Sequence, residues 1–333
     1  KKLFMIAYSL IQAWGWSYLF YIARKEWKDK GFSIFYPDQK PVALFDRISF
    51  QESYENYLNH VQFSNIKDSS NSNLPQITFL VYYESEKIQN LLSLLKSFLD
   101  QSFDNWNAIL ISKNNDPVDF SLLPNDNRIS LVLSTDIKVI SDKINSLEYD
   151  FLGSLDSNVI LPSYSLQAFV EFLKKNPNSD ILYSDHDSID ENGKRFNPFF
   201  KPNWSLTTFL SFDYISSLCI VKKDIAQKVL KNNDLNDFSF DFLLHCVNST
   251  NEITHVPSPL YSKIDSDPLF SNEYKKNILI KYFQENNIDA KIENGILPDT
   301  FRINYNLKSQ PKVSIFIPTK NNRELLQRCI DSI

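Results

Sequence analysis

Residues Pro75 to Phe98 read PQITFLVYYESEKIQNLLSLLKSF and decide the fold class. The first part, QITFLVY, is a short apolar run with the length and composition of a buried strand. From Ile88 onwards the apolar residues recur every three or four positions, which is the spacing of one helix face. The stretch therefore predicts a strand that leads directly into a helix.

The same alternation continues along the chain. Strand-like runs are WNAILIS (106–112), ISLVLS (129–134), FLGSLD (151–156) and DILYSD (180–185), and helix-like segments cover 137–147 and 164–176. Helices between such strands imply crossover connections, so we expect an α/β domain with a Rossmann-like, mostly parallel sheet and helices on both faces. Ligands of such sheets bind at the carboxyl ends of the strands. Those ends fall at 82–86, 112–116, 156–158 and 185–187.

The regions around this domain differ from it in composition. SNIKDSSNSN (64–73) is polar like a linker. We therefore expect a helical amino-terminal region with its linker (1–74), the α/β domain (75–265), and a helical extension with a linker (266–310). PKVSIFIPTKNNRELLQRCIDSI, from Pro311, repeats the pattern that begins at Pro75. Residues 311–333 should thus form a strand and a helix, the truncated start of a second domain in a longer parent protein.

The composition excludes several classes of protein. Hydrophobic residues make up 43% and charged residues 23%, a globular mixture rather than a disordered or collagen-like one. The net charge of −5 gives no overall basic field, so nucleic acid is not an expected partner. Cys219, Cys246 and Cys329 lie far apart and form no C-x-x-C pair, which indicates reduced thiols in a cytoplasmic protein rather than zinc ligands.

Leu3 to Ile22 form an uncharged, aromatic-rich stretch. Its length could span a bilayer, but polar residues such as Ser9 and Gln12 dilute it. An aromatic-rich helix can equally lie at a membrane surface or pack on a domain. The sequence leaves these alternatives open, and we expect a cytoplasmic protein that is peripheral to the inner face of the membrane if this helix lies on the surface.

Two of the predicted strands end in closely spaced polar side chains. SLDSN (154–158) places Asp156 and Asn158 after one strand, and SDHD (184–187) places Asp185 and Asp187 after another. Carboxylate oxygens are the ligands that Mg²⁺ prefers, and a divalent cation can hold a diphosphate. Aspartate also favours turns. By spacing alone, each pair fits either a metal site or a turn.

The segment DILYSDHDSIDENGKRFNPFFKPNWSLTTFLSFDYISSLCIVKKD (180–224) is similar to tandem-domain family-2 glycosyltransferases of bacterial cell-surface polysaccharide synthesis. The likeness extends to HVPSPLYS (255–262), ENGILPDTFRINYNL (293–307) and, more weakly, YENYL (54–58). It implies the A-type glycosyltransferase fold and transfer of a sugar from a nucleotide-sugar donor to a glycan or lipid-linked acceptor, typically with inversion. It also implies a divalent cation (Mn²⁺ or Mg²⁺) and a following glycosyltransferase domain in the parent chain.

The resemblance places the donor site at the ends of the first strands. It assigns nucleotide-sugar binding to Tyr82, Glu84, Ser112 and Asp156. The metal motif D-H-D-D of the family falls on 156–159, so Asp156 and the neutral Asn158 are the expected ligands of a weak or absent metal.

Three departures from the family fall on three roles of the reaction. Ser112 stands where the family has the first of two aspartates, the one that contacts the nucleobase, and Lys113 stands in the second place. Asn158 replaces a metal carboxylate. Ser239 falls on the catalytic base, and a hydroxyl is no base near neutral pH. A shift of register would offer Asp237 or Asp241 as the base instead.

The SDHD segment matches the family beyond its main metal motif. The resemblance therefore gives Asp185, Asp187 and Asp190 as loop-organising residues, with a metal on Asp185 and Asp187 as the alternative. The histidines at 186, 245 and 255 are not clustered like metal ligands, so we expect hydrogen-bonded structural roles for them.

Three functions remain open from the sequence. The first is a glycosyltransferase whose catalysis in this domain is impaired. The second is a noncatalytic module of the same fold that binds glycan or positions the following domain. The third, a nucleotidyltransferase, shares the sheet and the metal chemistry, but the likeness of 180–224 favours glycosyl transfer.

Overall fold

The computed structural model describes residues 54–58, 74–113, 119–232, 235–264 and 271–333. The strands are β1 (Ile77–Tyr83), β2 (Trp106–Ser112), β3 (Ile129–Val132), β4 (Phe151–Asp156), β5 (Val159–Ile160), β6 (Ile181–Ile189), β7 (Arg195–Phe199), β8 (Leu218–Lys222), β9 (Ile253–Lys263), β10 (Ala290–Asn294) and β11 (Phe301–Tyr305). The helices are α3 (Ile88–Leu99), α4 (Ile137–Asn145), α5 (Ser165–Lys175), α6 (Leu206–Ser211), α7 (Lys223–Asn232), α8 (Phe240–Val247), α9 (Asn272–Glu285) and α10 (Arg323–Asp331), with 3₁₀ turns η2 (Ser85–Lys87) and η3 (Phe120–Leu122).

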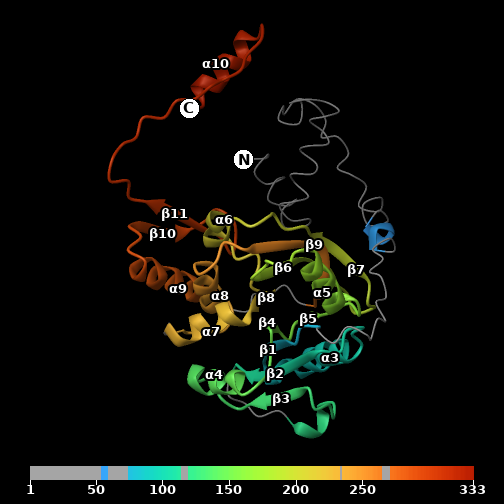
Figure 1. Ribbon diagram of the computed structural model, residues 1–333. Coiled ribbons are helices and arrows are strands. Elements are labelled where there is room, and N and C mark those ends of the chain that lie inside the picture. The colour runs from blue at the N-terminus through green and yellow to red at the C-terminus, as the bar shows by residue number, and fades with distance from the viewer. Residues whose placement is uncertain (1–53, 59–73, 114–118, 233–234, 265–270) are drawn as a thin grey trace.

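The predicted α/β domain is one nine-stranded sheet. Its strand order is β3-β2-β1-β4-β8-β6-β9-β5, and β7 pairs with β6 (Figure 1). The pairs of β1, β2, β3 and β4, and that of β6 with β9, are parallel. The remaining pairs of this sheet are antiparallel. They are those of β8 with β4 and β6, of β5 with β9, and of β7 with β6. The fold class is confirmed, with a mixed rather than a mostly parallel sheet.

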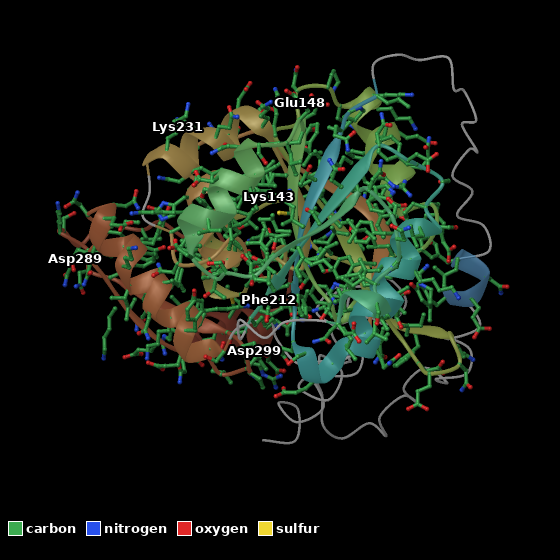
Figure 2. The ribbon with its side chains drawn as sticks, turned by 90° about the horizontal axis from the view of Figure 1, so that it is seen from below. Lys143, Glu148, Phe212, Lys231, Asp289 and Asp299 are labelled. Atoms are coloured by element: carbon green, nitrogen blue, oxygen red, sulfur yellow. The ribbon has the colours of Figure 1, made fainter. Side chains whose placement is uncertain are left out.

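Helices cover both faces of this sheet, as the sequence predicts. Along β1 the side chains alternate between two cores: Leu80 and Tyr82 lie in one, and Phe79 and Val81 in the other. The first core is closed by α4 and α6 to α9, and the second by α3 and α5. In Figure 2, α4, α7 and α9 lie on one side of the strands and α3 on the other.

The carboxyl-terminal extension contains a hairpin where the sequence predicts a linker. β10 and β11 pair antiparallel, with Ile292 opposite Ile303. Ile292 and Phe301 are buried in the same core as α9. The apolar residues of this segment alternate because one face of the hairpin packs on the domain.

The predicted repeat from Pro311 is found in part. The helix is present as α10, but Val313–Ile317 forms no strand. Figure 1 shows α10 well apart from the body of the domain. Val313 is 76% exposed and Phe316 is 92% exposed. Among the described residues no strand pairs with this run, whereas Ile77–Tyr83 is paired with β2 and β4. The strand prediction is therefore wrong for this structure.

The amino-terminal predictions fall mostly outside the described residues, including those for 3–22. Residues 54–58 are helical, as expected. No helix within the described ranges is long and apolar enough to cross a membrane.

Candidate functional site

The carboxyl ends of β1, β2 and β4 meet at the point where the strand order reverses. β1 lies between β2 and β4. The chain runs from β1 to β2 and β3 on one side and then returns to β4 on the other side. Open α/β sheets bind ligands at this point. Tyr82 is paired with Asp156, and the Ser157 backbone N–H donates to the Tyr82 carbonyl at 2.8 Å. The predicted residues Tyr82, Glu84, Ser112 and Asp156 are thus all brought to this edge.

Lys113, for which the sequence predicts no role of its own, joins two of these carboxylates. Its Nζ donates to Glu84 Oε1 and to Asp156 Oδ2, both at 2.8 Å. The lysine and aspartate side chains are only 16% and 11% exposed. Its position directly after a buried strand was the signal available in the sequence. The result is an ammonium between two carboxylates at the switch point.

The remaining oxygens of the degenerate metal motif are also engaged. Asp156 Oδ1 accepts from the Asn158 backbone N–H at 2.8 Å, and Asn158 Oδ1 accepts from Asn90 Nδ2 at 2.8 Å. The described ranges contain no group of three or more His, Cys, Asp or Glu that could hold a metal ion. An ammonium against Asp156 would also repel a divalent cation. The residues present, in this arrangement, do not fit the implied metal.

Asp237, one candidate base, lies in front of α8. Its Oδ1 accepts from the backbone N–H groups of Ser239 at 2.6 Å and Asp241 at 3.2 Å, and its Oδ2 accepts from the Tyr274 hydroxyl at 2.9 Å. Burial raises the pKa of Asp237 to about 6, although these hydrogen bonds oppose the shift. A carboxyl with this pKa suits general base catalysis, but both oxygens already serve the helix and Tyr274.

Asp241, the other candidate, has the opposite electrostatic character. Its Oδ2 accepts from the backbone N–H and the side-chain amide of Asn236, both at 2.7 Å. Burial acts to raise its pKa, but hydrogen bonds from His245 and Asn236 outweigh burial and lower the pKa. Asp241 is therefore a charged structural residue of α8.

Tyr82 connects these aspartates to the switch point. Its hydroxyl accepts from the Phe238 backbone N–H at 3.2 Å. Burial, followed by the charge of Asp237, raises the pKa of Tyr82. The side chain of Tyr82 therefore spans from β1 to the loop before α8. Ser239, on which the base position falls, lies buried between Asp237 and Asp241.

The SDHD segment does not lie at a strand end. Asp185 and Asp187 are inside β6, which continues to Ile189 because it pairs with β7 and β9. Asp185 Oδ1 accepts from the Lys201 backbone N–H and lies 2.7 Å from His255 Nε2. These contacts make Asp185 a buried framework residue rather than a loop residue.

Asp187 is a buried partner of β7 and of the amino-terminal helix. Its Oδ2 accepts from Arg195 Nε at 2.7 Å and from the Tyr54 hydroxyl at 2.5 Å. An oxygen held by a guanidinium is a poor metal ligand, so the arrangement does not fit a metal here either. Asp190 does organise a turn, since its Oδ1 accepts from the N–H groups of Asn192 and Lys194.

The structural roles predicted for the histidines are confirmed. His186 Nδ1 lies 3.2 Å from the Tyr261 hydroxyl, and His245 Nε2 lies 3.5 Å from Asp241 Oδ1. His255 is held by Asp185, as described above.

Comparison with known proteins gives two curated relatives, while no family model matches the chain. The O-antigen biosynthesis protein RfbC of Myxococcus xanthus is 27% identical over 195 residues, which cover 55% of this chain and 15% of RfbC. The uncharacterized protein y4gI of Sinorhizobium fredii is 24% identical over 284 residues, which cover 78% of this chain and 31% of y4gI. The chain thus spans less than a third of either relative.

Solved structures of S. aureus TarS are also similar. TarS 1–349 superposes with a TM-score of 0.43 at 16% identity, over 62% of this chain and 70% of that chain. TarS 1–349 in complex with UDP-GlcNAc gives 0.44 at 16% identity, over 61% of this chain and 64% of that chain. The match to an O-antigen biosynthesis protein agrees with the likeness of 180–224 to proteins of bacterial cell-surface polysaccharide synthesis.

Proposed function

We propose that this chain carries a nucleotide-sugar-binding glycosyltransferase module of cell-surface polysaccharide synthesis, and that transfer by this domain is impaired. The observation that carries the proposal is the Lys113 ammonium on Asp156, 2.8 Å from its Oδ2. The chain has the edge of the sheet where the family holds its donor, but the Asp156 carboxylate at this edge is paired with the Lys113 ammonium.

The candidate bases support the same proposal. Asp237 and Asp241 both accept hydrogen bonds that fix α8, and both are buried. A general base must reach the proton that it removes, and its loss costs about 10² to 10⁴ in rate. Both oxygens of Asp237 and Oδ2 of Asp241 already accept hydrogen bonds, and Ser239 has no carboxylate to offer.

An active transferase is the second candidate, favoured by the pKa of Asp237 of about 6. A base of that pKa is half-charged near pH 6 and mostly charged at neutral pH. In this alternative, Tyr274 would release the Asp237 carboxylate when an acceptor binds.

The wider setting belongs to the same proposal. The acceptor would be a glycan or a lipid-linked glycan, and the site of action the cytoplasmic face of the membrane. Residues from Pro311 would begin the following catalytic domain, for which α10 and the apolar run before it are the support.

The test uses the complete chain. Nucleotide-sugars with UDP, GDP and dTDP are titrated by calorimetry, and transfer to polysaccharide fragments is followed by mass spectrometry. We expect weak binding and transfer near background. Metal-dependent transfer that is abolished in Asp156→Ala and kept in the turn variant Asp190→Ala would overturn the proposal and restore the active enzyme.

A further inference from the structure

A second lysine lies beside the degenerate metal motif. Lys263 is the last residue of β9 and is paired with Val159, the residue that follows Asn158. The next residue, Ile264, donates its N–H to the Asn158 carbonyl at 2.9 Å. The backbone of β9 therefore fixes Lys263 against the end of the SLDSN segment.

Lys263 has no bonded partner in the part of the chain that the structure describes. Its side chain is half-buried, and its Nζ makes no hydrogen bond or ion pair there. Burial lowers the pKa of Lys263, while the charges of Asp213 and Asp156 oppose this shift. A cation that is removed from water without a partner costs free energy, which a bound anion would recover.

Two lysine ammonium groups act on Asp156. Lys113 donates to its Oδ2 at 2.8 Å, and the charge of Asp156, after that of Asp213, opposes the lowering of the Lys263 pKa. Together the two ammonium groups carry the charge of one divalent cation. Lys113 also uses only two of its three N–H donors in its bonds to Glu84 and Asp156.

We propose that Lys263, with Lys113, binds the diphosphate of the donor in place of a divalent cation. This inference rests on the proposed function for the identity of the ligand. Two ammonium groups, of which that of Lys263 has no partner among the described residues, provide the charge and the N–H donors that phosphate oxygens require. The asparagine and valine at 158 and 159, where the family has carboxylates, would then be consistent with a site that holds no metal.

Inorganic pyrophosphate is the probe, titrated into the complete chain by calorimetry in EDTA and again with Mn²⁺ at a fixed KCl concentration. We expect the same affinity in both buffers, within about twofold. Lys263→Met should weaken binding about ten- to a hundredfold, since one charge-assisted hydrogen bond is lost. Lys263→Arg should retain most of the affinity.

The matched control is Lys222→Met. Lys222 is also a partly buried lysine, but it pairs with Phe151 at the opposite end of β4 and with Asp180. The Lys222→Met variant should bind pyrophosphate with the affinity of the wild type. Binding that requires Mn²⁺, or equal affinities of the Lys263→Met and Lys222→Met variants, would overturn the inference, as would no binding at all.

The two proposals fail in distinguishable ways. Metal-independent binding of pyrophosphate without binding of any nucleotide-sugar leaves the lysine site standing and removes the proposed function. Binding of nucleotide-sugars that depends on Mn²⁺ and is unaffected by Lys263→Met leaves the proposed function standing and removes the lysine site.

Discussion

Asp237 and Asp241 lie four residues apart, yet the fold shifts their pKa values in opposite directions. Both are buried, so burial favours the neutral form of each. Asp241 receives enough hydrogen bonds from Asn236 and His245 to stay charged, whereas Asp237 does not. The chemistry of a carboxyl at this site is therefore set by its neighbours rather than by its spacing in the sequence.

The raised pKa of Asp237 predicts a pH dependence of stability. Between its ordinary value of 3.8 and about 6, the folded chain retains a proton that the unfolded chain has released. The stabilisation of the fold by this retained proton is complete below pH 3.8 and is lost as the pH rises through 6. Asp237→Asn should remove it, so the stability of the variant relative to wild type should increase by roughly 3 kcal/mol at most from pH 4 to pH 7.

Urea unfolding at pH 4, 5.5 and 7 measures this difference. Asp190→Asn, in an exposed turn, is the control and should show no such trend. A constant difference between Asp237→Asn and wild type across the three pH values would contradict the assignment.

The buried pair of Asp187 and Arg195 gives a second prediction. The Asp187 side chain is fully buried, and Arg195 also donates to the Tyr164 hydroxyl and the Pro259 carbonyl. Arg195→Met should destabilise the fold by about 3–5 kcal/mol, because it leaves a buried charge without its partner.

A double-mutant cycle checks this prediction by chemical unfolding. Adding Asp187→Asn to Arg195→Met should recover part of the loss, since the uncompensated charge is gone. Lys194→Met, which breaks the exposed pair with Glu55, should leave stability unchanged. Additive losses in the cycle would show that the two side chains are not coupled.

At the scale of elements, β4 depends on a glycine at its centre. A Cβ on Gly153 would lie 2.7 Å from the Phe79 ring and 3.1 Å from the Cys219 carbonyl. β1 and β8 flank the strand on both sides, so neither neighbour can move far. Gly153 thus allows the close packing that places Asp156 at the switch point.

Gly153→Ala should therefore destabilise the domain by about 1–3 kcal/mol through overpacking. The next residue offers the control: the Ser154 hydroxyl is buried and, within the described ranges, has no hydrogen-bond partner. Ser154→Ala should be neutral or slightly stabilising. Thermal unfolding compares the two, and an unchanged melting temperature for Gly153→Ala would mean that the Phe79 ring can turn aside.

At the scale of the whole molecule, the segment after the hairpin (306–333) has no buried residue, and only two of its residues are partly buried. Residues 306–322 form no helix or strand, and α10 buries none of its side chains. Exposed backbone of this kind is where proteases cut first. The domain and this segment should therefore behave as separate units.

Limited trypsin digestion tests this expectation. Cleavage after Lys308, Lys312 or Lys320 should precede cleavage inside the sheet, and the trimmed chain should keep its thermal transition. Mass spectrometry identifies the fragments. Protection of all three lysines would show that 311–333 packs on the domain in solution.

The strands and helices whose patterns are local could be predicted from the sequence. Apolar runs and helical spacing give β1, β2, β4 and α5 to within about one residue and the start of α3, because these strands are buried on both faces and each helix buries one face. Spacing and resemblance likewise placed Tyr82, Glu84, Ser112 and Asp156 at one edge, since parallel strands end together.

The contacts of those residues follow from the folded arrangement of distant segments. The insertion of β8 between β4 and β6, and the continuation of β6 through Asp185 and Asp187, depend on pairing between segments far apart in the chain. The same distant pairing brings Lys263 to the SLDSN segment, and strand order brings Lys113 to Asp156. Charge pairing across the sheet leaves no periodic signal in the sequence, so the lysines of the site became visible only in the fold.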